Sequence, residues 1–73
     1  MEAVMMDVKA EVGFCAGEVY GFLLKSGGEV PLMQVIKSIR KEEDLIIAAI
    51  GWLLREDKID VSKQKDGMRV KLK

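Results

Sequence analysis

Length, composition and charge leave few classes of protein open to this chain. It has 73 residues, of which 49% are hydrophobic and 33% charged, and its formal net charge is zero. That composition is too hydrophobic for a disordered protein, and the length suits a single domain, residues 1–73, with a small core. One cysteine and no histidine exclude an intrachain disulfide and the usual zinc ligand sets.

No segment of the sequence indicates a membrane or secreted protein. Its apolar runs fall well short of the ~18 residues that a membrane span requires. The first eight residues contain Glu2 and Asp7 and no basic residue, unlike a signal peptide. We therefore expect a cytoplasmic protein.

The charges are distributed unevenly along the chain. Residues 1–57 contain six basic and ten acidic residues, whereas residues 58–73 contain six basic and two acidic ones. The C-terminal segment therefore carries the excess positive charge. Two interpretations stay open: a surface that faces phosphate groups, or lysines that keep a solvated hairpin from aggregating through its edges.

The first predicted helix spans about residues 7–25. Ser26-Gly27-Gly28 ends it, because glycine readily adopts the left-handed conformation of a C-terminal cap. Cys15 lies on the apolar face of this helix and is interpreted as structural rather than nucleophilic. The residues of this face recur at spacings of four and three, as one side of a helix requires: Val8, Val12, Cys15, Val19 and Phe22.

Three glycines recur every fourth residue within the same helix: Gly13, Gly17 and Gly21. Each weakens a helix by ~1 kcal/mol relative to alanine, so a close neighbour is expected on their face. We favour another helix of the same domain as that neighbour over a dimer interface formed with Trp52. A third alternative is that the helix begins only near Phe14 and leaves Gly13 in a turn.

Glu29-Val30 is compatible with a short strand, and two further helices are predicted at about residues 31–39 and 42–55. Pro31 suits a first helical position, Arg40-Lys41 separates the helices, and the acidic run Glu42-Glu43-Asp44 suits the positive end of a helix dipole. The third helix is apolar over most of its circumference. It is either a central core helix packed on both sides or a helix with one flank reserved for a partner.

Residues 58–73 are predicted to form an antiparallel hairpin. Apolar and polar residues alternate on both sides of the turn signal Asp66-Gly67. Three helices followed by a C-terminal hairpin give an α+β chain with the element order of a winged helix-turn-helix domain. The expected core residues come from all of these elements: Val19, Leu23, Leu32, Ile36, Leu45, Ala49, Leu53, Ile59 and Val70.

No motif predicts catalysis or a bound cofactor. The chain has no glycine-rich phosphate loop, and without histidine it cannot form a Ser/His/Asp or Cys/His arrangement. Consecutive acids such as Glu42, Glu43 and Asp44 point in different directions from a helix and are expected to be solvated. We expect no enzyme, no cofactor, no metal site and no small-molecule ligand.

The chain resembles a family of small, uncharacterised winged helix-turn-helix domains from about Val12 to Leu72. The resemblance is carried by VGFCAGEVYGFLL in the first helix and by AAIGWLLREDKI at the third. It implies a fold and a DNA-binding role, and it implies no enzyme, cofactor or particular target. Because folds host many functions, the surface residues must decide between roles.

The sequence supports two functional hypotheses. The first is a DNA-binding module, a candidate transcriptional regulator, that binds double-stranded DNA as a homodimer. The second is a protein-interaction or self-association module with the same fold. The dimer interface would comprise Gly13, Gly17, Gly21 and Trp52. The predicted phosphate contacts come from the helix-turn-helix and the hairpin: Lys37, Arg40, Lys41, Lys63, Lys65, Arg69 and Lys71.

Overall fold

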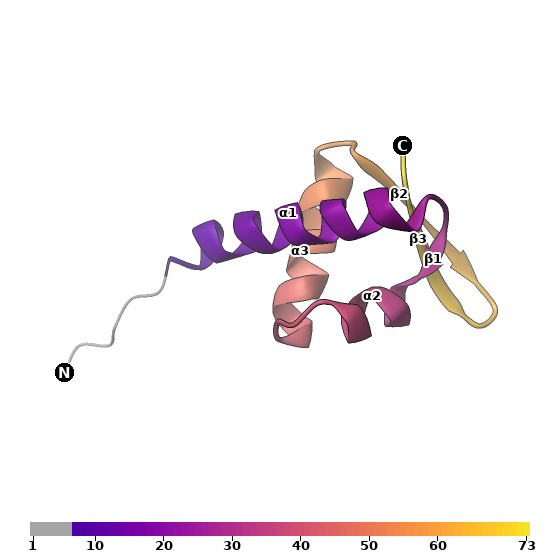
Figure 1. Cartoon of the computed structure of the whole chain (residues 1–73), viewed down its shortest axis with the longest axis horizontal. Coiled ribbons are helices and arrows are strands. Elements are labelled where there is room, and N and C mark those ends of the chain that lie inside the picture. Colours follow the sequence, from indigo (N-terminus) through magenta and orange to yellow (C-terminus); the bar gives the residue numbers. More distant parts are fainter. Residues whose placement is uncertain (1–6) are drawn as a thin grey trace.

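The computed structural model describes residues 7–73, which form three helices and a three-stranded antiparallel sheet (Figure 1). This confirms the α+β winged helix-turn-helix class. The expectation drawn from the first eight residues lies largely outside the described part of the chain. The elements follow in the order α1 (Val8–Ser26), β1 (Val30–Pro31), α2 (Leu32–Ser38), α3 (Glu43–Arg55), β2 (Ile59–Gln64) and β3 (Gly67–Leu72).

The sheet has one more strand than the predicted hairpin. Strand β3 lies between β2 and β1, and the short β1 pairs with it through Val30 opposite Val70 and Pro31 opposite Arg69. Pro31 is therefore a strand residue with extended backbone (φ −64°, ψ 143°) and not the first residue of the second helix. An edge strand tolerates proline, because its missing N–H is not required on the outer side.

The observed helix ends differ from the predicted ones by one residue in several places. Helix α1 begins at Val8 because the Asp7 carboxylate accepts a hydrogen bond from the Ala10 N–H at 3.2 Å. The helix is continuous through Gly13, so the alternative start near Phe14 is wrong. Gly27 ends α1 as expected, with a φ of 73° and its N–H donating to the Leu23 carbonyl at 3.2 Å.

An aspartate terminates α3 where glycine is usual. Asp57 has a φ of 64°, and the two backbone bonds of a Schellman motif form around it: Asp57 N–H to the Leu54 carbonyl and Lys58 N–H to the Leu53 carbonyl, both 3.0 Å. The Asp57 carboxylate also accepts a 2.7 Å hydrogen bond from Lys73 Nζ. The C-terminal end of β3 is thereby attached to the end of α3.

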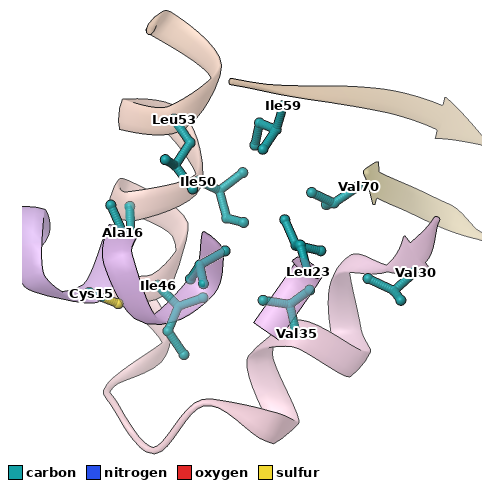
Figure 2. Packing of buried hydrophobic residues seen from close by; sticks show 12 residues of the cluster. Cys15, Ala16, Leu23, Val30, Val35, Ile46, Ile50, Leu53, Ile59 and Val70 are labelled. Carbon is teal, nitrogen blue, oxygen red and sulfur yellow. The ribbon is translucent and has the colours of Figure 1, made fainter. Parts of the chain in front are cut away.

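The core lies between the three helices and the inner face of the sheet, with Val35 as the contribution of α2 (Figure 2). Six of the nine expected core residues are buried, whereas Leu32, Ile36 and Leu45 are half-buried at its margin. Cys15 is fully buried, as expected for a structural cysteine, and burial raises the pKa of its thiol. The expected core omitted several residues that the packing buries: Val12, Cys15, Ala16, Val30, Val35, Ile46 and Ile50.

None of the helices in residues 7–73 is long and apolar enough to cross a membrane.

Replacement of Leu53 by alanine tests the orientation of α3. Leu53 is 4% exposed and belongs to the core cluster, so Leu53→Ala should lower the free energy of unfolding by ~2–5 kcal/mol. The matched control is Leu54→Ala on the same helix, because Leu54 is 47% exposed. Chemical denaturation that gives equal losses for the two variants would contradict this orientation.

Two substitutions of Asp57 test the strain at the end of α3. Asp57→Gly and Asp57→Ala both remove the carboxylate that binds Lys73, but only glycine adopts positive φ without strain. We expect the glycine variant to exceed the alanine variant by ~1 kcal/mol in free energy of unfolding. Equal stabilities would show that the left-handed backbone at this position is not a source of strain.

Candidate nucleic-acid interface

The wing formed by β2 and β3 ends in a two-residue turn, Lys65-Asp66. Gln64 pairs with Gly67 across the base of this turn, and Gly67 provides the positive φ of 124° that resumes the second strand. Figure 1 shows the turn at the end of the molecule opposite the first turns of α1. Lys65 is therefore presented at the tip of a projecting hairpin.

The strand register distributes the predicted wing cations over both faces of the hairpin. Lys63 pairs with Met68 and lies on the same face as Val61 and Val70, beyond the edge of the core. Arg69 and Lys71 lie on the opposite face. The three lysines of this group are exposed, whereas the Arg69 guanidinium is half-buried and lies 3.8 Å from the Asp66 carboxylate.

Acidic neighbours offset half of the positive charge counted for residues 58–73. Lys58 lies 3.9 Å from Glu56, and Lys73 contacts both Asp57 at 2.7 Å and Asp60 at 4.0 Å. The hydrogen bond that the Lys73 ammonium donates to the Asp57 carboxylate raises the pKa of Lys73. With Arg69 also paired, the cations of this segment that have no ion pair within residues 7–73 are Lys63, Lys65 and Lys71.

The remaining predicted cations lie at the end of α2 and in the loop after it. Lys37 and Arg40 are exposed, whereas Lys41 Nζ lies 3.8 Å from the Glu18 carboxylate of α1. Figure 1 shows α2 between the wing and this loop. The predicted phosphate contacts therefore form two groups separated by α2, and Lys41 is partly neutralised within its group.

The outer face of α3 lacks the donor side chains that read guanine and adenine. Glu43 and Asp44 are exposed in its first turn, next to the exposed Glu42. The following outward positions carry no side-chain hydrogen-bond donor until Arg55, although recognition of guanine and adenine in the major groove depends on such donors. These outward positions are Ile47, Ala48, Gly51 and Leu54.

The glycine face of α1 is only partly covered. A methyl group on Gly13 would lie 3.8 Å from the Trp52 ring, an ordinary contact, so α3 does approach the helix there. At Gly17 and Gly21 nothing lies within 4 Å of such a methyl group. The interpretation that another helix of the domain crosses all three glycines is therefore wrong for Gly17 and Gly21.

Sequence reasoning missed the Asp57–Lys73 contact, which has a large effect on the charge of the wing. The two residues are 16 positions apart, and their contact depends on the left-handed turn at Asp57 and on the register of β2 with β3. The one local signal was Asp57 itself, because aspartate adopts the left-handed conformation more readily than most residues other than glycine.

Comparison with known proteins agrees with this architecture. Residues 5–72 match a family described as a winged helix-turn-helix domain (DUF2582). The chain belongs to this family. It is also 43% identical over 72 residues to the uncharacterized protein MJ1608 of Methanocaldococcus jannaschii, an alignment that covers 94% of this chain and all of the relative. Helix-turn-helix folds can bind DNA, so the surfaces of the wing and of the helices are the candidate contact surfaces of this fold.

Proposed function

We propose that the protein binds nucleic acid through phosphate contacts from its wing, without reading base sequence through α3. The observation that carries this proposal is the set of wing lysines without an ion pair within residues 7–73: Lys65 at the tip, Lys63 on one face of the hairpin and Lys71 on the other. These lysines are exposed on a projecting hairpin. Lysine side chains of this kind bind backbone phosphates independently of sequence.

The charges of the other surfaces keep this binding weak. Glu42, Glu43 and Asp44 stand at the end of α3 that approaches DNA in helix-turn-helix docking, and they repel phosphate. A role as a sequence-specific transcription regulator would require base contacts that the apolar outer face of α3 does not provide. Sequence-tolerant contact with double-stranded DNA is the function that this distribution of charge supports best.

The outer face of α3 supports a second candidate, contact with a protein. Ile47 and Leu54 are large apolar side chains exposed on one side of this helix, with Ala48 and Gly51 between them. Contiguous exposed apolar surface is typical of protein interfaces. Titration with duplex DNA at low salt separates the two candidates, because only the nucleic-acid-binding role requires the protein to form a complex with the duplex.

Removal of the free wing lysines should weaken binding to all duplexes alike. Each phosphate contact contributes roughly −0.9 to the slope of log affinity against log salt concentration, so Lys63→Ala, Lys65→Ala and Lys71→Ala should each flatten that slope. Fluorescence anisotropy with labelled duplexes of unrelated sequence, at several salt concentrations, measures both effects. The triple variant should show the largest loss.

The matched control is Lys9→Ala, which removes one exposed lysine from the N-terminal turn of α1, away from the wing. It should leave the salt slope unchanged, whereas Lys65→Ala flattens it. Equal effects of the two variants would indicate a response to net charge alone and would contradict a site on the wing. The absence of any complex for the unaltered protein at low salt would refute the proposal.

Reversal of charge at the start of α3 should strengthen binding. Glu42→Lys and Glu43→Lys replace repulsion of phosphate by attraction at the end of the helix that approaches the duplex. Each should raise the affinity at low salt, and the gain should shrink as salt increases. Because a lysine in the first turn opposes the helix dipole by ~0.3–1 kcal/mol, thermal unfolding is measured in parallel. An unchanged affinity in folded variants would place this end of α3 away from the nucleic acid.

A further inference from the structure

Helix α1 has a second apolar face, on the side opposite its contact with α3. Its inner face packs into the core through Val12, Cys15, Ala16, Val19 and Leu23. The outer face carries no charged residue and follows the alternating spacings of four and three that define the seam of a coiled coil. We call this outer face the α1 seam: Ala10, Phe14, Gly17, Gly21 and Leu24.

Two large apolar side chains of the seam are left in water. Phe14 is 75% exposed and Leu24 is 58% exposed. Between them, Gly17 and Gly21 leave open space where side chains would stand. Nothing in residues 7–73 requires glycine at these two helical positions, although each lowers helix stability by ~1 kcal/mol relative to alanine. Packing among residues 7–73 does not explain this combination of exposed large residues with a recessed middle.

We propose that the α1 seam is covered by the same helix of a second copy of this chain, running antiparallel to it. A two-fold axis midway between Gly17 and Gly21 sets Phe14 of each copy against Leu24 of the other. The glycines of the two helices then meet at the axis, where their lack of side chains allows a close approach. Each large residue covers the exposed apolar surface of its counterpart, whereas Ala10 lies opposite the end of the partner helix.

The charges beside the seam favour the antiparallel direction. Glu11, Glu18 and Lys25 follow one edge of the seam at intervals of seven, whereas the other edge carries the uncharged Gly13 and Tyr20. In an antiparallel pair like edges face each other, so that Glu11 of each copy lies beside Lys25 of the other. In a parallel pair this edge would face the uncharged one, and no opposite charges would meet.

The same arrangement brings the two copies of Glu18 together at the centre. Each Glu18 carboxylate already lies 3.8 Å from Lys41 Nζ in its own chain, which offsets the repulsion. The rest of the molecule leaves the seam accessible, because α3 packs on the other side of α1 and the N-terminal turns of α1 extend beyond the sheet and the other helices (Figure 1). Both observations are compatible with a symmetric pair.

Sedimentation of the full chain over a range of concentrations tests the pairing. The unaltered protein should dimerise, and Phe14→Glu should weaken the association at least ~10-fold because it places a charge in the seam. Phe14 is exposed, so circular dichroism should show an unchanged fold. The matched control is Met33→Glu on α2, where the replaced side chain is 57% exposed, and it should leave the association unchanged. A strictly monomeric wild-type protein at millimolar concentration would overturn the proposal.

Charge exchange tests the direction of the two helices. Glu11→Lys alone and Lys25→Glu alone should each weaken the dimer, and the two together should restore it, because the exchanged charges again meet across the antiparallel pair. A double variant that is no tighter than the single ones would overturn the antiparallel arrangement. Gly17→Leu provides a further check: it should raise the stability of the isolated helix while weakening the dimer, and a tighter dimer would likewise refute the close approach at the axis.

Discussion

The packing of α1 against α3 determines which surfaces this protein presents. Both helices carry apolar residues around most of their circumference, so either could in principle bury more than one face. Once Val19 and Leu23 of α1 join Ile46 and Leu53 of α3 in the core, the opposite faces of both helices remain outside. Both exposed apolar surfaces, the α1 seam and the outer face of α3, therefore result from the packing of these two helices against each other. Burial of the inner faces supplies the hydrophobic stabilisation, and the outer faces are left for other molecules.

Local ion pairs shape the electrostatics of the fold more than its net charge does. The positive excess of the C-terminal segment falls on three lysines, because Lys58, Arg69 and Lys73 each lie close to an acidic residue. The start of α3 keeps its acids without any such partner in residues 7–73. This distribution, with a positive wing and an acidic start of α3, supports the proposed contact with a phosphate backbone rather than with bases.

Dimerisation through α1 would also raise the affinity with which the positive wings bind nucleic acid. One domain offers few phosphate contacts, and the affinity of a single wing is correspondingly small. A symmetric pair joins two wings in one particle, so that the second contact becomes intramolecular and the overall affinity rises without any new type of interaction. The two proposals remain separable, because the seam and the wing share no residue.

The class of the fold and most of its elements could be predicted from local patterns in the sequence. The spacing of Val12, Cys15 and Val19 depends only on the helical period, and the alternation around Asp66-Gly67 only on the pleat of a strand, so both are readable from local pattern. The residues of the core were predicted less completely. Leu32, Ile36 and Leu45 lie at its margin, because burial depends on which of several apolar faces packs against a neighbouring element.

The tertiary structure alone decided the features that depend on residues distant in the chain. Pro31 was expected in a helix, but it lies in the edge strand β1, because the backbone there pairs with β3. Lys73 was counted among the positive charges of the C-terminal segment, but in the fold its charge is offset by the Asp57 carboxylate. The open space over Gly17 and Gly21 could not be inferred from their spacing, since the same pattern serves packing inside a domain and between two molecules. Local order follows from neighbouring residues, whereas the free surface of a helix is defined only after every other element has been placed.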